Sequence, residues 1–497
     1  MRRGFLKTST TQSRPAQTDA APARGSQRRV IPASSLFKLS DNLLLKIFTL
    51  ASRPKLKINT NSFDIDNHST FFTKKVDPLP FRLSHTSSRL RTLALSTPAL
   101  WATLGDFALR SSALLDIFLV RSKEEPLDIC ISASYISRRR LNQLVAHVHR
   151  WRKFIIDNDT EGFEDMSDDA SEGDLDLDDL DKLKSLSDTI LRHFEGCAAP
   201  KLEYLDLGYI SSEELIFILS GGTPALNTLK VAGAPIFPAD CSSLKRLSLY
   251  TSPGEWFPFD HEDLEDLWGD MLSLTHIQIR GEIVPRWPEI SDVSPVKMPS
   301  LRFLDICLVE DEEACPMIQP HCVSALLATI SAESLGHLSL SYMAPEILSS
   351  FLTNLQKGTF CFPRVTSLTW GTHLTKEQDV KSIAQYFPAV RTLTLDQCEA
   401  ECFLKALLPG DETSPVLWSA LRRLNLQWAP IPLLRNFVTA RSRCGHPIQR
   451  IWLLKVTGLA SDANRDHLKW LGNNIKLRIV SNLATFQAEA IGWHKAV

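Results

Sequence analysis

Residues 202–207 read Leu-Glu-Tyr-Leu-Asp-Leu, and this Leu-x-x-Leu-x-Leu phrase, with conservative exchanges of its apolar residues, occurs ten times between Leu202 and Leu453. The first residues of successive copies lie 18 to 34 residues apart. A phrase that returns at such a spacing indicates a repeat architecture, in which each copy forms one unit of a stack. The ten copies are Leu202-Leu205-Leu207, Leu226-Leu229-Val231, Leu244-Leu247-Leu249, Leu274-Ile277-Ile279, Leu301-Leu304-Ile306, Leu335-Leu338-Leu340, Val365-Leu368-Trp370, Val390-Leu393-Leu395, Leu421-Leu424-Leu426 and Ile448-Ile451-Leu453.

The end of each copy alternates apolar and variable positions, which is typical of a short strand with one buried side. Because so short a strand cannot bury its apolar side alone, we expect the copies to stack in parallel around one core. Segments with apolar residues at helical spacing separate the copies. The sequence therefore predicts an α/β solenoid with a parallel sheet on its concave face and helices on its convex face. The expected helices are 213–219, 323–330, 345–355, 376–387, 402–408, 433–441 and 462–471.

The composition fits one long solenoid with a small additional module. The chain has 497 residues, of which 44% are hydrophobic, and a formal net charge of -2. This charge gives no global attraction to nucleic acid or membrane, and no apolar run approaches the roughly 20 residues that span a bilayer. The ten cysteines are dispersed and form no complete zinc-ligand set. We therefore expect a soluble protein of the cytoplasm, the nucleus or both, with free thiols, no metal and no cofactor.

Charge is distributed unevenly along the chain. Residues 1–35 carry seven Lys and Arg against one Asp and few bulky apolar residues, so this segment is expected to be a disordered basic tail. Residues 157–181 contain 13 acids and no base, which predicts a solvated acidic insertion at 157–188.

Part of the acidic insertion matches the spacing of a calcium-binding loop. Glu164 departs from that template, because an aliphatic residue is usual there, and Asp168 is shorter than the usual Glu. A flexible acidic loop is therefore the preferred interpretation. The matching residues are Asp157, Asp159, Glu161, Gly162 and Asp168.

Residues 36–110 are expected to form a small helical module that is split by a polar loop at 53–79. The first part of this module has apolar residues at helical spacing, and Ser40 or Asp41 is placed to cap the helix. Residues 111–497 would then form the solenoid. Its first strand is indicated by an early imitation of the phrase, Trp151-Phe154-Ile156.

Three stretches resemble fungal F-box proteins with C-terminal leucine-rich repeats. Residues 39–48, Leu-Ser-Asp-Asn-Leu-Leu-Leu-Lys-Ile-Phe, resemble the first F-box helix, usually written L-P-x-E-L-L-x-x-I-F. Residues 83–101, which end in Leu-Trp, resemble the second half of the box, and residues 114–129 are similar to the helix and strand that follow it. The spacing of the copies brackets the roughly 20 to 29 residues of a leucine-rich repeat. The chain departs from the box motif at three positions, Ser40, Asn42 and Leu90, where Pro, Glu and Trp are usual.

The resemblance implies a non-catalytic adaptor. F-box helices pack on the Skp adaptor of a cullin-RING (SCF-type) ubiquitin ligase, and the solenoid holds the substrate protein. An apolar run on so many sides of one helix also requires a covering surface, which is either a partner or the first repeats. By position, the residues implied for the Skp contact are Leu39, Leu43, Leu44, Ile47 and Phe48.

The residues before and between the outer apolar positions of each strand are expected to face the concave side. Several are aromatic or arginine, the residue types that protein interfaces favour, although an ordinary solvated face would also fit. The candidate substrate-binding residues are Tyr204, Arg246, His276, Phe303, Asp305, Arg423, Arg450 and Trp452.

No enzyme signature stands out in the sequence. It holds no phosphate-binding glycine loop, no Gly-x-Ser-x-Gly elbow and no His-Glu-x-x-His pair. Three hypotheses remain: a ligase substrate receptor, a solenoid protein-binding scaffold that no longer docks a ligase and, more remotely, an unrecognised enzyme.

Overall fold

The protein is represented by a computed structural model, in which the chain forms two units, residues 1–47 and 48–497. The basic tail expected at 1–35 and nearly all of the acidic insertion, with four of the five calcium-loop positions, lie outside the described residues. The structure describes residues 38–52, 79–132, 137–157, 192–209, 215–233, 235–251, 257, 260–308, 319–360, 362–396, 398, 400–409, 416–454, 462–480 and 486.

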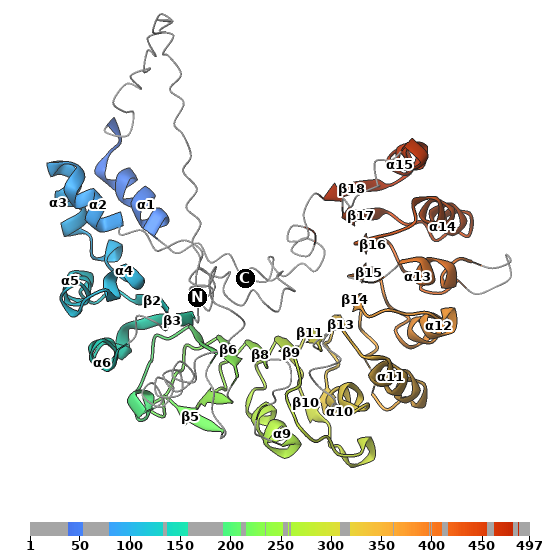
Figure 1. Cartoon of the computed structure of the whole chain (residues 1–497), viewed down its shortest axis with the longest axis horizontal. Coiled ribbons are helices and arrows are strands. Elements are labelled where there is room, and N and C mark those ends of the chain that lie inside the picture. The colour runs from blue at the N-terminus through green and yellow to red at the C-terminus, as the bar shows by residue number, and fades with distance from the viewer. Residues whose placement is uncertain are drawn as a thin grey trace, which may run out of the picture. The chain divides into compact units, whose positions relative to one another are not determined.

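The unit of residues 48–497 contains a parallel sheet of 14 strands that follow one another in chain order (Figure 1). This sheet confirms the expected α/β class, and the second and third apolar residues of all ten phrases lie on its strands. The early strand expected at Trp151 is also present and pairs with the strand of the first phrase. The strands are β1 (Thr103–Leu104), β2 (Leu127–Ser132), β3 (Trp151–Asp157), β4 (Tyr204–Tyr209), β6 (Thr228–Ala232), β8 (Arg246–Tyr250), β9 (His276–Arg280), β11 (Phe303–Cys307), β13 (His337–Ser341), β14 (Ser367–Gly371), β15 (Thr392–Leu395), β16 (Arg423–Leu426), β17 (Arg450–Leu454) and β18 (Lys476–Val480).

The middle apolar residues of the ten phrases form one continuous row through the sheet. Each is the register partner of the next, and each is almost completely buried. Stacking therefore supplies the apolar surface that one short strand lacks, as the sequence predicts. The row is Leu205, Leu229, Leu247, Ile277, Leu304, Leu338, Leu368, Leu393, Leu424 and Ile451.

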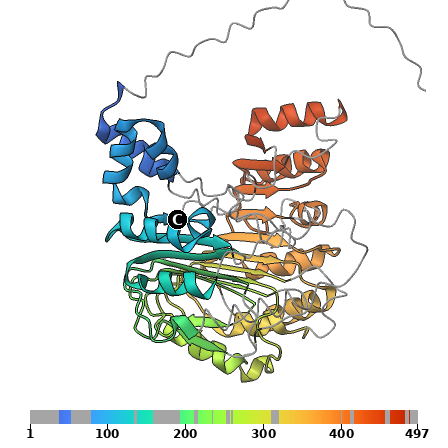
Figure 2. The ribbon, with the colours of Figure 1, turned by 60° about the vertical axis from the view of Figure 1, so that its left-hand side comes forward.

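Helices follow most of the later strands and lie on the outer side of the sheet in both ribbon views (Figures 1 and 2). They confirm six of the seven helices expected from the sequence. The sequence reasoning missed α9, although an Asp260–Asp263 capping box and buried Leu264 and Trp268, four residues apart, mark it. The helices are α9 (His261–Asp270), α10 (Cys322–Ala328), α11 (Pro345–Lys357), α12 (Glu377–Tyr386), α13 (Ala400–Ala406), α14 (Ile431–Arg443) and α15 (Asp462–Asn474).

The prediction of a helix at 213–219 is wrong for residues 215–219, which the structure describes. Ile216–Ile218 form strand β5, which pairs in parallel with β7 (Ile236–Pro238) in a separate sheet. Ile-Phe-Ile combines β-branched and aromatic residues, which favour a strand. Its partner β7 belongs to the next repeat, which is only 18 residues long. A second short pair, β10 (Val296–Lys297) with β12 (Ile330–Ser331), lies further along the chain.

The amino-terminal helices are confirmed within residues 38–52 and 79–100. Helix α1 (Asp41–Ser52) begins after Ser40, whose Oγ accepts a hydrogen bond from the amide of Leu43 at 3.4 Å. The other elements up to β3 are α2 (Leu79–Thr86), α3 (Ser88–Ser96), η2 (Pro98–Leu100), α4 (Asp106–Leu109), α5 (Ser112–Ser122), α6 (Arg138–Val145) and η4 (Val148–Arg150).

Trp101, the end of the box-like segment, anchors α3 to the elements that follow. Its Nε1 donates to the carbonyl of Ala94 at 2.7 Å, and its ring lies 5.2 Å from that of Phe118 and 4.4 Å from the guanidinium of Arg121. Strand β1 comes only two residues later, so the sheet begins inside the range expected for the helical module. Of the helices in the described residues, none is both long and apolar enough to cross a membrane.

Candidate protein-binding face

The register of the sheet gathers all eight candidate substrate-binding residues into two rows, one on each side of the row of middle apolar residues. Parallel strands lie about 4.8 Å apart, so neighbours within a row can interact. The first row holds Tyr204, Thr228, Arg246, His276, Phe303, His337, Ser367, Thr392, Arg423, Arg450 and Lys476. The second row holds Asp206, Lys230, Ser248, Gln278, Asp305, Ser339, Thr369, Thr394, Asn425, Trp452 and Arg478.

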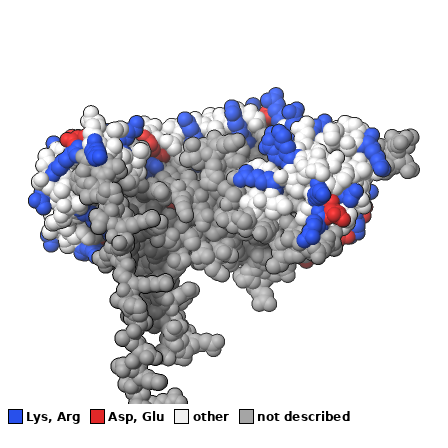
Figure 3. Space-filling model, turned by 90° about the horizontal axis from the view of Figure 1, so that it is seen from above, with Lys and Arg blue, Asp and Glu red and all other residues white. Residues whose placement is uncertain are grey.

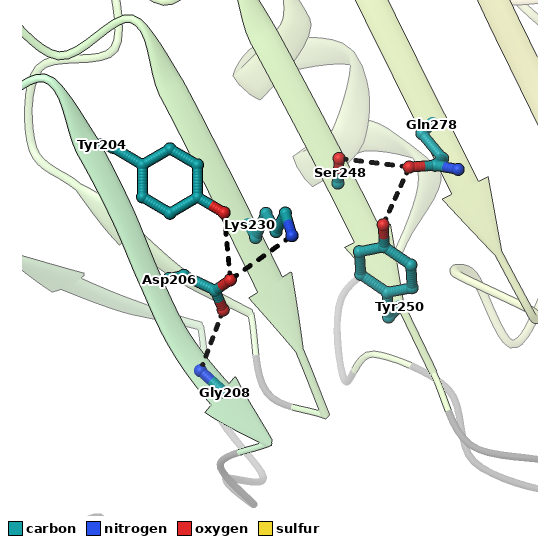
Figure 4. Close-up of polar contacts among 7 residues, drawn as sticks. All are labelled: Tyr204, Asp206, Gly208, Lys230, Ser248, Tyr250 and Gln278. Atoms are coloured by element: carbon teal, nitrogen blue, oxygen red, sulfur yellow. Dashed lines mark hydrogen bonds and ion pairs between the residues drawn. The ribbon is translucent and has the colours of Figure 1, made fainter. Parts of the chain in front are cut away.

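Asp206 is the centre of the first polar cluster on this face (Figure 4). The hydroxyl of Tyr204 donates to its Oδ2 at 3.2 Å, the Nζ of Lys230 lies 3.5 Å from the same oxygen, and the amide of Gly208 donates to Oδ1. Burial alone would lower the pKa of Lys230, but Tyr204, Asp206 and Tyr250 outweigh it and raise that pKa. Lys230 therefore stays charged, and Asp206 offsets its charge within the face.

A second polar cluster continues across the next strands (Figure 4). The hydroxyls of Tyr250 and Ser248 donate to Oε1 of Gln278 at 2.8 and 3.5 Å, and Nε2 of Gln278 donates to Oδ2 of Asp305 at 3.1 Å. These groups satisfy one another, so this part of the face is internally hydrogen-bonded.

Phe303 lies between two histidines of the first row. Its ring stacks on that of His276, with centroids 4.3 Å apart and planes at 6°, and lies 5.6 Å from the ring of His337. Burial, followed by the positive charge of Arg246, lowers the pKa of His276 to about 4, and burial also lowers the pKa of His337. Both rings are therefore neutral at pH 7, as their apolar packing requires.

We expect these histidines to make the solenoid sensitive to acid. Their folded pKa values lie below the value of about 6.5 in an unfolded chain, so the unfolded state binds more protons below pH 6.5. Their stabilising effect is complete above about pH 6.5 and is lost as the pH falls towards 4. For His276 this loss is up to about 3 kcal/mol. Thermal unfolding between pH 7 and pH 4 measures this. The loss of stability should be smaller in the double variant His276→Gln/His337→Gln. It should be unchanged in the control His149→Gln, which alters an exposed ring. Equal acid sensitivity of the double variant and the wild type would contradict this role of the two histidines.

The carboxyl-terminal end of the face is cationic and aromatic. Arg478 lies over the ring of Trp452 at 5.4 Å. Trp452 is half-buried and packs against a small core of Leu454, Val480 and Phe486. Arg423, Arg450 and Lys476 of the first row are exposed or half-exposed.

The residues implied for a Skp contact do not all face one way. Leu43 and Ile47 are exposed by 52% and 42%, whereas Leu44 and Phe48 are buried. Leu39 is half-buried. An additional residue, Leu50, is exposed by 58%, and its spacing from Leu43 and Ile47 places all three on one side of α1. The sequence shows this spacing, but only the burial identifies the exposed side.

No metal-binding cluster accompanies these surfaces in the described residues. No three His, Cys, Asp or Glu side chains among them lie close enough to hold a metal ion. The eight cysteines that the structure describes are all free thiols.

Comparison with protein-family models finds none that matches this chain, and comparison with curated proteins finds no significant match. The class is therefore defined by the structure itself. It is a solenoid-like α/β protein with a long parallel sheet, one face of which carries polar, aromatic and cationic side chains.

Proposed function

We propose that the protein is a substrate-recognition adaptor of a cullin-RING (SCF-type) ubiquitin ligase. Helix α1 docks the Skp adaptor, and the strand face of the sheet binds a substrate protein. The observation that carries the proposal is the apolar side of α1, where Leu43, Ile47 and Leu50 are all more than two-fifths exposed. Burial of one such side chain contributes about 1.5 to 3 kcal/mol, so a partner that covers all three gains substantial affinity.

The burial of Leu44 and Phe48 supports this docking mode. Leu44 and Phe48 lie on a stripe of α1 next to the one that carries Leu43, Ile47 and Leu50, so their burial leaves the second stripe exposed to a partner. The order of helices that ends in Leu100-Trp101, followed by helix α5 and strand β2, agrees with the organisation that the F-box resemblance implies.

The substrate half of the proposal rests on the strand face. Its aromatic and arginine side chains are the types that contribute most to protein interfaces. The polar clusters around Asp206 and Gln278 hold part of this face in a fixed arrangement, which lowers the entropy that binding must remove.

The test is capture of a purified Skp adaptor by the full chain. The double variant Leu43→Asp/Ile47→Asp should bind at least about 100-fold more weakly, because two apolar contacts are replaced by charges. The matched control is Val120→Asp/Phe217→Asp, which changes two other exposed apolar residues on different elements and should bind like the wild type. Equal losses in both double variants would contradict a specific α1 interface.

A solenoid scaffold that no longer docks a ligase is the second candidate. The observation in its favour is the departure from the F-box motif at Ser40, Asn42 and Leu90. Absence of any adaptor binding by the wild-type chain would favour this alternative.

A further inference from the structure

The last repeats are strongly basic in a chain that is nearly neutral overall. Residues 416–480 contain eleven Lys and Arg but only two acids, whereas the whole chain has a net charge of -2. Figure 3 shows blue Lys and Arg side chains outnumbering red Asp and Glu at its right-hand end, which the carboxyl-terminal strands and helices form. This local excess exists although nothing in the repeat phrase requires a charge.

Three of these cations form a ladder on the strand face. Arg423, Arg450 and Lys476 are register partners on the adjacent strands β16, β17 and β18, and we call them the cation strip. Strands about 4.8 Å apart place their charges close together, and like charges in neighbouring positions of a sheet are destabilising. None of the ion pairs in the described residues involves a side chain of the strip, and strands β16–β18 contain no acid.

One cation of the earlier repeats has an acidic partner within the strand face. Lys230 in the second row has Asp206 within 3.5 Å and Tyr204 beside it, so its charge is offset inside the protein. The cation strip has no such partner in the described residues, and Trp452 lies two residues after Arg450 on the same strand. The repeat phrase does not require these three positive charges, and no acid of the described residues pairs with them. They are therefore available to a ligand of opposite charge from another molecule.

We propose that the cation strip binds an acidic peptide segment of the substrate protein. This inference rests on the proposed function, because it names what the substrate face recognises. In an extended peptide, side chains on one side recur about every 6.6 to 6.8 Å. Long, flexible Arg and Lys side chains absorb the difference from the spacing of about 4.8 Å between strands. A segment with Asp or Glu at alternate positions can therefore place one carboxylate at each cation.

The experiment measures fluorescence anisotropy of a labelled twelve-residue peptide of alternating Glu and Ser, with the full chain as titrant. The variant Arg423→Glu/Arg450→Glu/Lys476→Glu should weaken binding by about 30-fold or more and should flatten its salt dependence. The matched control is Lys357→Glu/Arg443→Glu/Lys469→Glu, which changes the net charge equally at exposed positions of helices α11, α14 and α15. This control should bind within about threefold of the wild type.

Equal losses in the two triple variants would overturn the proposal, because net charge alone would then explain binding. An oligonucleotide of equal charge that binds the strip more tightly than the peptide would also overturn it. A Ser-phosphorylated version of the peptide, compared with the unmodified one, distinguishes phosphates from carboxylates as the source of the anions. If the Glu triple variant unfolds at a lower temperature, the Gln triple variant replaces it and should also lose binding.

Skp adaptor binding is measured on the same samples. The strip variant should keep it, so loss of peptide binding alone reports on the cation strip. If the chain binds no adaptor but binds the peptide through the strip, the ligase function is rejected. The proposal that the strip binds an acidic peptide is then retained.

Discussion

Replacing Leu338 by Asp is expected to abolish the folded solenoid. Leu338 lies in the middle of the continuous apolar row, in register with Leu304 and Leu368, and is completely buried. The substitution removes a core side chain and places a carboxylate where no cation or water can reach it. The expected loss exceeds about 5 kcal/mol, which is comparable to the whole stability of many domains.

Urea unfolding followed by circular dichroism measures this effect. The control is Arg364→Asp, which introduces the same group at an exposed position directly before the next phrase. The free energy of unfolding of the control should lie within about 0.5 kcal/mol of the wild-type value. A Leu338→Asp protein with the wild-type transition would show that the stacked row does not hold the sheet together.

Replacing Arg441 by Met is expected to cost about 3 to 5 kcal/mol of the free energy of unfolding. Arg441 on α14 is completely buried without a carboxylate partner in the described residues, and burial lowers its pKa to about 10. Its guanidinium donates to three carbonyls, those of Leu417 at 2.9 Å, Trp418 at 2.8 Å and His446 at 3.2 Å. Met fills similar space but leaves these buried acceptors without their donor.

The result can be read from the melting temperature and from hydrogen exchange of residues 416–454. Arg441→Lys should be almost as destabilising, because one ammonium group cannot reproduce the planar geometry of three donors. Arg443→Met, two residues away at an exposed position, is the control and should change little. An Arg441→Met protein as stable as this control would show that the buried hydrogen bonds make no net contribution.

The sequence predicts the sheet well because one local rule determines it. Each phrase carries its own strand signal, and a constant apolar pattern aligns every strand with the next. The prediction was wrong at 213–219, where apolar residues at helical spacing were also β-branched and aromatic. It missed α9, where acidic residues hide two apolar positions four residues apart, Leu264 and Trp268.

The candidate residues were placed on the correct strands, but their pairing could not be predicted. The contact of Asp206 with Lys230, or of Gln278 with Asp305, depends on the register between residues 24 to 27 positions apart. The sequence also could not say which side of α1 is exposed, because tertiary packing, not the helix pattern, sets the rotation of a helix whose apolar residues surround it.

The polar and cationic parts of the strand face suit different tasks in the proposed adaptor. The clusters around Asp206 and Gln278 are satisfied internally and rigidify the surface. The cation strip has no acidic partner in the described residues. Its charge is therefore available to attract a partner and to fix the orientation in which that partner binds.

Calorimetric titration of a purified Skp adaptor into the full chain tests the adaptor function most directly. We expect one adaptor bound per chain, with a dissociation constant of about 1 µM or tighter and a negative heat-capacity change from burial of the apolar side of α1. Leu43→Asp/Ile47→Asp should remove this binding, while Val120→Asp/Phe217→Asp should keep it. No saturable binding by the wild-type chain, or equal binding by both double variants, would contradict the adaptor function.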